Sequence, residues 1–248
     1  MKLSILMPSF NRTSQLPGAL AALCLQKVGF EFETFVLNDA HEDGTREICQ
    51  ASRLPNLRYV FTGGRNYARL IRRNPGFPLN YAARRLATGE YLLLSCAEML
   101  PVDPTLLADM VETAEALPGR LVIPDGRDDL AFRLRPPVSV EVAAAAYYSL
   151  APLNTQYPFF MLLSRDVYVG IGGYDEDFLT PGYDDTDFVQ RLQDAGHGYV
   201  RVRGRVLHQY HSQHHDNTGD IWAPNRKLFA ARRGTVVRNQ NRDWGTNL

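Results

Sequence analysis

The sequence predicts an α/β protein with a mostly parallel, doubly wound central sheet and helices on both faces. Two observations predict this fold. Short apolar segments alternate with helix-length segments of 3.6-residue periodicity from the first residues onward. Each apolar segment also ends in a turn of polar residues, as strands do when they lead into covering helices. No internal repeat or long low-complexity tract interrupts this pattern.

The first half of the chain alternates strands and helices most regularly. Predicted strands cover residues 3–7, 32–37, 57–61 and 90–94, each a short apolar segment. The intervening helices are predicted near Thr13 or Ser14, with Leu16, Leu20, Leu23 and Cys24 on the buried face, near residues 43–45, with Ile48 facing inward, and over residues 80–86, ending at Gly89.

The second half continues the pattern around one irregular segment. Strands are predicted over residues 121–124, 159–163 and 199–207, and helices open at residues 101–104, at Arg165 and at Asp184. Residues 125–158 are charged and interrupted by prolines before an alanine-rich helix over residues 140–150. We interpret them as an insertion that shapes one wall of a ligand crevice.

Composition excludes several classes of function. The 27 basic and 27 acidic residues balance, which gives no field to attract nucleic acid or an anionic membrane. The first apolar run is broken at Pro8, so we expect a strand there rather than a signal peptide, and no apolar stretch is long enough to span a bilayer. Cys24, Cys49 and Cys96 are scattered without a CxxC pair, which predicts reduced thiols in a cytoplasmic protein and argues against structural zinc.

Three acids cluster at the start of the helix predicted from residue 184. Asp184, Asp185 and Asp187 follow a loop closed by Thr180-Pro181-Gly182. One acid would suffice to cap the helix, so the cluster favours a site where a fixed carboxylate meets a ligand. The buried face of this helix is predicted to hold Phe188, Leu192 and Ala195, with an Asp187–Arg191 pair on the outer side.

In doubly wound parallel sheets, ligands bind beyond the carboxyl ends of the strands. The polar residues at 9–12 and 38–43 follow two predicted strands, so they are predicted to line one ligand crevice. The glycine-rich, basic segment 62–78 could present cations to an anionic ligand, but we favour a solvated role for most of its arginines, Arg65, Arg69, Arg72 and Arg73.

Four segments, spread from residue 3 to about residue 211, resemble the inverting family 2 glycosyltransferases of the GT-A fold, which use nucleotide-diphosphate sugars. SILMPSFNR resembles the first strand and turn of that family, and VLNDAHEDGTREI is similar to its VVDDGSTDGT pattern. GGYDEDF and GYDDTDFVQRL together are similar to its GGFDE and EDxDL motifs, the most specific of the matches. The remaining segment, after the strand at residues 90–94, corresponds in position to a family motif but differs from it in sequence.

The resemblance implies a donor site for a nucleotide sugar, with UDP the expected carrier. Asp39 is expected to accept a hydrogen bond from the uracil edge, a task that suits a carboxylate, although a simple turn-forming role is the alternative. The other residues implied at this site are Pro8, Ser9, Asn11, Arg12, Asn38, Arg69 and Asn80.

The segment that departs from the family pattern is the one that usually binds a metal ion in this family. Ser95-Cys96-Ala97 stands where the family usually has the Asp-x-Asp pair that bridges a divalent cation to the diphosphate. The resemblance implies Glu98, His208 and His211 as replacement ligands for Mn²⁺ or Mg²⁺, since carboxylate and phosphate oxygens suit both ions. The alternatives are a capping role for Glu98 and an unliganded histidine cluster at residues 208–215.

The resemblance also implies the residues of the transfer step. Asp185 is expected to be the general base and Asp184 the neighbouring acid that orients the acceptor. An inverting displacement needs a base that takes the proton of the acceptor hydroxyl, and a carboxylate is already deprotonated at neutral pH. Gly173, Tyr183 and Trp222 are the residues expected at the acceptor site.

The sequence thus predicts a GT-A glycosyltransferase domain over residues 1–215, with a nucleotide-binding half at 1–100 and an acceptor half at 101–215, and a C-terminal extension at 216–248 near the active site. Its central hypothesis is that Asp39 and Asp185 face one cleft. Two alternatives remain: a catalytically silent binder of nucleotide sugar or glycan, and a nucleotidyltransferase. PSFNRTSQ lacks the glycine- and lysine-rich loop usual in the latter, and no GxGxxG follows a predicted strand, which argues against a dehydrogenase.

Overall fold

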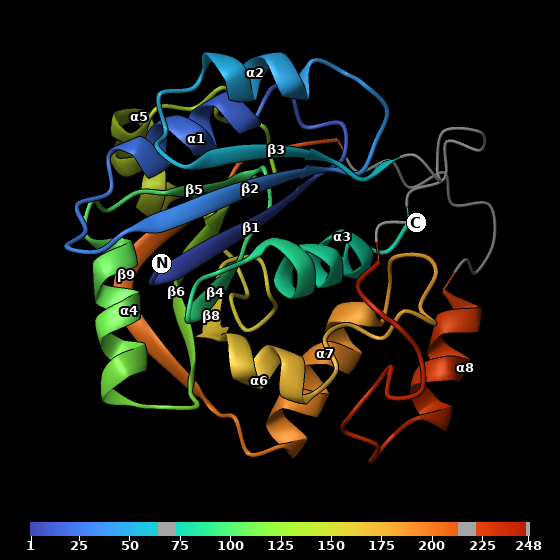
Figure 1. The fold of residues 1–248 in the computed structure, drawn as a ribbon. Coiled ribbons are helices and arrows are strands. Elements are labelled where there is room, and N and C mark those ends of the chain that lie inside the picture. The colour runs from blue at the N-terminus through green and yellow to red at the C-terminus, as the bar shows by residue number, and fades with distance from the viewer. Residues whose placement is uncertain (64–72, 213–221, 247–248) are drawn as a thin grey trace.

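The computed structural model describes residues 1–63, 73–212 and 222–246. Its centre is a sheet of nine strands in the order β3-β2-β1-β4-β8-β6-β9-β5, with β7 (Ala151–Pro152) paired to β6 (Figure 1). Strand β1 (Leu3–Ser9) lies between β2 (Phe32–Asn38) and β4 (Tyr91–Leu94), and β3 (Leu57–Phe61) flanks β2. These four strands are parallel, so their carboxyl ends meet at one edge.

The other half of the sheet is mixed. Strand β8 (Met161–Ser164) runs antiparallel to both β4 and β6 (Leu121–Asp128), whereas β9 (Tyr199–His208) is parallel to β6. The short β5 (Met99–Pro101) closes the sheet antiparallel to β9. The predicted α/β class, a mostly parallel sheet with helices on both faces, is confirmed.

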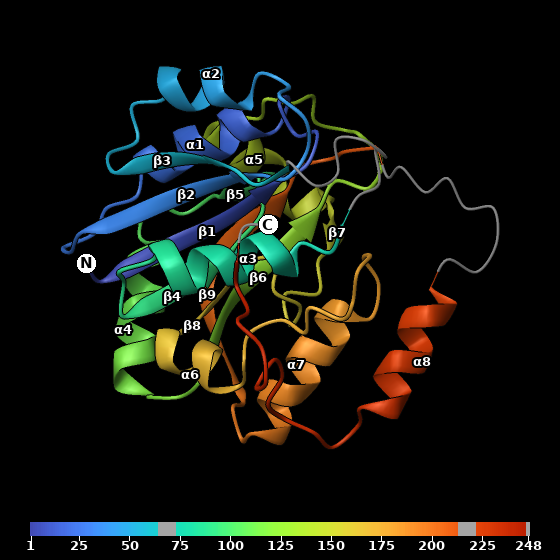
Figure 2. The same ribbon diagram turned by 45° about the vertical axis from the view of Figure 1, so that its right-hand side comes forward.

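Alternation along β1 explains why both faces are covered. Leu3, Ile5 and Met7 pack with α1 (Leu16–Cys24), α2 (Thr45–Ala51) and α4 (Leu106–Ala116). Leu6 points to the opposite face and packs with α3 (Gly76–Tyr81), α6 (Arg165–Gly170) and α7 (Asp184–Asp194). Figures 1 and 2 show α1 and α2 on one side of the strands and α3, α6 and α7 on the other. Burial on both faces accounts for the continuous apolar character of β1.

Residues 125–158 and the C-terminal segment add further helical elements. Helix α5 (Val140–Ala146) and the 3₁₀ turn Tyr147–Ser149 pack with Leu100 of β5 and Leu207 of β9 in a small third core. Helix α8 (Ala223–Ala231), which the sequence did not predict, lies in the described segment 222–246. In Figure 2 it stands beside α7 at the side of the molecule.

Several local predictions were wrong. Cys24 is exposed at the end of α1, and Ala195 is exposed past the end of α7. Asp187 and Arg191 do pair, with Oδ2 and Nε 2.7 Å apart, but each side chain is only 2% exposed, so this pair lies inside the protein and not on its outer side. The helix expected from Asn80 begins at Gly76 and continues as a π-helical turn over Ala82–Leu86.

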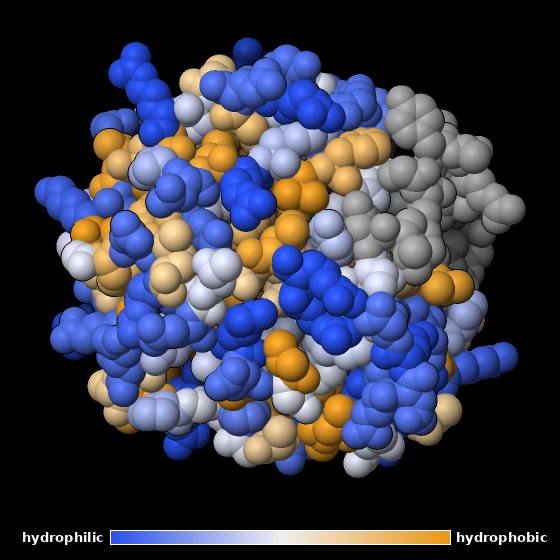
Figure 3. All heavy atoms as spheres, in the orientation of Figure 1, coloured by the Kyte–Doolittle hydropathy of each residue, from blue (hydrophilic) through white to orange (hydrophobic). Residues whose placement is uncertain are grey.

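The surface in the orientation of Figure 1 shows apolar residues in small groups separated by hydrophilic side chains (Figure 3). Among the described residues, none of the helices is both long and apolar enough to cross a membrane.

Candidate active site

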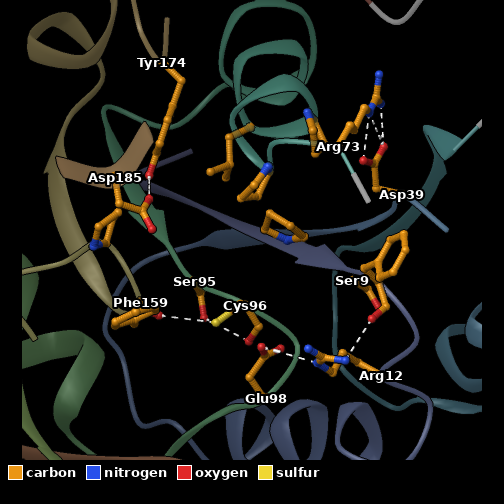
Figure 4. Close-up of a pocket in the computed structure, with 16 residues that line it drawn as sticks. Ser9, Arg12, Asp39, Arg73, Ser95, Cys96, Glu98, Phe159, Tyr174 and Asp185 are labelled. Atoms are coloured by element: carbon orange, nitrogen blue, oxygen red, sulfur yellow. Dashed lines mark hydrogen bonds and ion pairs between the residues drawn. The ribbon is translucent and has the colours of Figure 1, made fainter. Parts of the chain in front are cut away.

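One cavity lies beyond the carboxyl ends of β1, β2 and β4 (Figure 4). The residues that follow these strands, Phe10, Asp39 and Ser95, all line it. Backbone hydrogen bonds hold these turns together, with Asp39 N 2.9 Å from Ser9 O and Ser95 N 2.9 Å from Leu6 O. Across the cavity lies Asp185, at the start of α7. Asp39 and Asp185, 146 positions apart in the chain, therefore face the same space, as the central hypothesis required.

Asp39 is held by a buried arginine. The Nε atom of Arg73 lies 2.8 and 2.7 Å from the two carboxylate oxygens of Asp39, and the Thr62 hydroxyl donates to Oδ1 at 2.8 Å. Burial raises the pKa of Asp39, and the hydrogen bonds and charge of Arg73 oppose that rise. Both residues line the cavity. The pair presents a carboxylate of fixed orientation beside a guanidinium, a combination that can accept and donate hydrogen bonds to one planar ligand.

Asp184 and Asp185 occupy the first turn of α7, where unpaired N–H groups favour negative charge. Asp184 is buried, and its Oδ1 accepts a hydrogen bond from the Gly182 N–H at 2.6 Å. Burial and the neighbouring charge of Asp185 raise the pKa of Asp184. Asp185 lines the cavity and accepts a hydrogen bond from the Tyr174 hydroxyl at 2.8 Å. Of the two adjacent acids, Asp185 is therefore the one presented to a ligand.

Glu98, His208 and His211 converge beside the cavity. One ligand atom from each lies within 4.8 Å of the others. Glu98 lies in the turn before β5, His208 at the end of β9 and His211 in the turn after β9. The Nδ1 atom of His208 lies 2.9 Å from Asp128 Oδ1, and its Nε2 faces Glu98 at 3.9 Å. Burial lowers the pKa of His211 to about 4, which keeps its imidazole neutral at pH 7. Two imidazoles and a carboxylate, with one imidazole oriented by a further carboxylate, are a donor set that fits a divalent metal.

Arg12 supplies a cation next to these groups. Its Nε lies 3.4 Å from Glu98 Oε1, and both side chains are largely buried (Figure 4). Burial alone would raise the pKa of Glu98, but the charge of Arg12 and the facing imidazoles hold it below its ordinary value. Glu98 is thus an ionised carboxylate at the cavity wall, with a guanidinium that also lines the cavity.

The other residues implied for donor binding differ in position. Pro8 and Ser9 line the cavity, and the buried Ser9 Oγ has no hydrogen-bond partner among the described residues. Asn11 is exposed and outside the lining, in a left-handed backbone conformation with φ of 56°. Asn38 is buried, and its side-chain amide makes hydrogen bonds within its own turn: the oxygen accepts from Ala40 N–H, and the amino group donates to His41 O. Asn80 is buried behind the cavity and bonded to Tyr168 and Tyr174. Arg69 lies outside the described residues.

The residues implied for the acceptor lie around α7. Gly173 is buried, and a Cβ built there would lie 2.3 Å from Asn80 Oδ1 and 2.7 Å from the Trp244 ring. Tyr183 immediately precedes α7 with φ of 65°, and its ring contacts Phe229. Trp222 is 43% exposed and lies against Gly182. Gly173 thus occupies a packing position, while Tyr183 and Trp222 border the loop that leads to Asp185.

Some residues of the cavity were missed from the sequence. Arg73 was grouped with solvated arginines, yet it is 9% exposed and paired with Asp39. Tyr174 and Phe159 line the cavity, as do Ser95 and Cys96 of the Ser95-Cys96-Ala97 segment, which stands where the family usually has Asp-x-Asp. The GGYDE motif contained Tyr174, so the motif was a usable signal for it. No local pattern indicated Arg73.

Two protein-family models match the chain. The model for glycosyl transferase family 2 matches residues 4–127, which is half of the chain. A second model, described as the N-terminal domain of galactosyltransferase, matches residues 151–215, the segment that contains Tyr174, Asp184 and Asp185.

Individual relatives are more distant. Chondroitin synthase of Escherichia coli is 25% identical over 239 residues, which is 85% of this chain but 34% of that protein, so the chain spans about a third of its length. Among solved structures, TarS 1–349 of S. aureus in complex with UDP-GlcNAc has a TM-score of 0.65 at 16% identity, over 93% of this chain and 66% of that one. The mannosyltransferase PcManGT of Pyrobaculum calidifontis, in complex with GDP-Man and Mn²⁺, has a TM-score of 0.58 at 18% identity, over 86% and 58%. These likenesses show the GT-A fold.

Proposed function

The chain belongs to glycosyl transferase family 2, and from this premise we propose that it moves a sugar from a nucleoside-diphosphate sugar, with UDP as the carrier, to a hydroxyl acceptor with inversion. The observation that carries the proposal is the placement of Asp39 and Asp185 on opposite sides of one cavity. Further support comes from TarS, a structural relative that binds UDP-GlcNAc.

Asp185 is the general base in this proposal. The acceptor hydroxyl attacks the anomeric carbon as the bond to the diphosphate oxygen breaks, and its proton passes to the Asp185 carboxylate. That carboxylate lies at the start of α7 and accepts a hydrogen bond from the Tyr174 hydroxyl, two contacts that favour negative charge there. Asp184, buried beside it, orients the loop around the acceptor through its hydrogen bond from Gly182. Positioning then contributes more to the rate than a tuned pKa.

The donor lies along the opposite wall. Asp39 accepts from the base edge while Arg73 holds its carboxylate in place, and Ser9 Oγ offers an unused hydrogen-bonding group nearby. Arg12 faces the diphosphate and can shift its pairing from Glu98 to phosphate oxygens. Glu98, His208 and His211 would hold a divalent metal, which would stabilise the charge of the departing diphosphate. PcManGT, with its bound Mn²⁺, supports this part of the proposal.

A ligand screen tests the proposal. We expect UDP and one UDP-sugar to raise the unfolding temperature in the presence of Mn²⁺, because a ligand at 100 times its Kd stabilises the folded state by about 2.7 kcal/mol. The panel is UDP-GlcNAc, UDP-glucose, UDP-glucuronic acid and GDP-mannose, with release of the nucleotide measured in parallel. D39N is expected to lose most of the UDP effect, and D166N, which changes an exposed acid of α6, is the matched control.

The same screen separates the alternatives. A UDP-sugar that binds without any release of UDP, with or without glycan acceptors, would assign the chain as a silent binder. Release of pyrophosphate from a nucleoside triphosphate and a sugar phosphate would assign a nucleotidyltransferase. Either result would overturn the transferase proposal.

The metal ligands can be tested by direct binding. E98Q is expected to weaken Mn²⁺ binding at least about tenfold, since even groups that only orient metal ligands contribute that much. Calorimetry with Mn²⁺ in the presence of UDP gives the affinity, and E90Q, at an exposed glutamate, is the control. Turnover that survives a chelator undiminished would remove Glu98, His208 and His211 from the list of ligands.

A further inference from the structure

Tyr174 connects the cavity to the buried interior behind it. Its side chain is 1% exposed, and its hydroxyl donates a hydrogen bond of 2.8 Å to Asp185 Oδ1 (Figure 4). The two residues lie 11 positions apart, Tyr174 in the loop after α6 and Asp185 in the first turn of α7. The contact therefore depends on how that loop is folded back onto α7.

The ring of Tyr174 has little freedom to move. It stacks on Phe188 of α7, with ring centroids 4.3 Å apart and planes 1° from parallel. Because Phe188 lies one turn beyond Asp185 on the same helix, the stack places the hydroxyl relative to the carboxylate. A fixed ring loses little conformational entropy when it makes this hydrogen bond.

The backbone of Tyr174 is held from two other parts of the chain. Asn80 accepts from its N–H and donates to its carbonyl oxygen, both at 2.9 Å. Asn239, from the C-terminal segment, donates to the same carbonyl at 2.7 Å. Asn80 thus acts on the far side of Tyr174 from the cavity, in place of the donor contact expected from the sequence.

We propose that Tyr174 is a positioning residue for Asp185: its hydroxyl holds the carboxylate in one orientation and favours its ionised form. The inference rests on the proposed function, because it assigns Asp185 as the base. A phenol suits this task, since it donates to a carboxylate from a rigid ring, whereas a phenylalanine at the same place would keep the packing and lose the hydrogen bond.

The electrostatic surroundings agree with this role. Burial, reinforced by the charge of Asp185, raises the pKa of Tyr174 well above its ordinary value, so the hydroxyl keeps its proton and remains a donor. Asp184 is the adjacent acid on α7, and Asp39, Arg73, Arg12 and Glu98 are the other charged residues that line the cavity. The hydrogen bond from Tyr174 distinguishes Asp185 from Asp184, which accepts from Gly182 instead.

The test compares Y174F with Y168F. Tyr168 is the matched control because it is also fully buried and contacts Phe188, but its hydroxyl donates to Asn80 and not to Asp185. The readout is UDP release from the most active UDP-sugar of the panel above, as a function of pH, with UDP affinity from calorimetry and unfolding temperature as checks on binding and folding.

We expect Y174F to lower kcat about tenfold and to move the acid limb of the pH profile upward by about one unit, because removal of a donor to the carboxylate raises its pKa. The affinity for UDP should change less than about twofold. Y168F should keep the wild-type acid limb.

An unchanged acid limb in folded Y174F, or an equal shift in Y168F, would overturn the inference and reduce Tyr174 to a packing residue. If Y174F is unfolded at the assay temperature, its acid limb is measured at a lower temperature at which it folds: a limb moved upward relative to wild type at that temperature would support positioning by hydrogen bonding, and the wild-type limb would overturn it. Failure of the proposed function looks different, since wild-type protein would then release no UDP at all.

Discussion

D185N is expected to reduce sugar transfer by about 10³-fold while the affinity for UDP stays within about twofold. The amide keeps the size of the carboxylate but cannot take the acceptor proton, and general base catalysis contributes about 10²–10⁴-fold. Asp185 sits across the cavity from Asp39 and Arg73, so the binding of the nucleotide base should be unaffected. Steady-state transfer and calorimetry with UDP measure the two quantities separately.

The control for this variant is D194N, which changes an acid that is exposed near the end of the same helix. It should retain full activity. If D185N lost UDP affinity and kcat together, Asp185 would become a donor-binding residue and the base would have to be sought elsewhere. A fully active D185N would end the assignment altogether.

D187A is expected to lower the free energy of unfolding by about 3–5 kcal/mol, the usual cost of removing one partner from a buried ion pair. Asp187 Oδ2 accepts from Arg191 Nε at 2.7 Å, and its Oδ1 accepts from Arg238 Nη2 at 2.9 Å. All three side chains are at most 5% exposed. Alanine would leave two buried guanidinium groups with less compensation, although Asp175 also pairs with Arg238.

This network joins α7 to the C-terminal segment. Arg191 also donates to the carbonyl oxygens of Ile171 and Gly173, so the loss of Asp187 should loosen the loop that carries Tyr174. Urea titration monitored by circular dichroism gives the stability, and D194A on the exposed side of α7 should lie within about 0.5 kcal/mol of wild type. A change of less than 1 kcal/mol in D187A would contradict the importance assigned to the network.

Local periodicity was enough to predict most of the fold. The strands predicted at residues 3–7 and 32–37 lie within β1 and β2, which are short runs buried on both sides. The strand predicted at residues 57–61 coincides with β3, a partly buried strand at the end of the strand order. Elements without such a pattern were missed. Strand β5 has three residues and ends in a proline, and α8 belongs to a polar, basic segment whose apolar side chains are few.

The interior of α7 shows where pattern reasoning fails. A charged pair at spacing i, i+4 normally lies on the solvent side of a helix, so Asp187 and Arg191 were expected there. They are buried because Arg238, 51 positions from Asp187, provides a second charge partner. The sequence of α7 by itself does not indicate that Arg238 pairs with Asp187.

The sequence by itself determined the α/β architecture, the family resemblance and the chemical types of Asp39, Glu98 and Asp185, because each depends on short stretches of neighbouring residues. Only the tertiary structure decided which polar side chains face the cavity and which are used inside the protein. It brought Arg73 to Asp39, Tyr174 to Asp185 and two histidines to Glu98, and it turned Asn80 and Gly173 away into packing positions. The physical reason is that packing between distant parts of the chain decides which polar groups face the cavity and which have their hydrogen bonds used in the interior, and that packing is set by folding and not by local sequence.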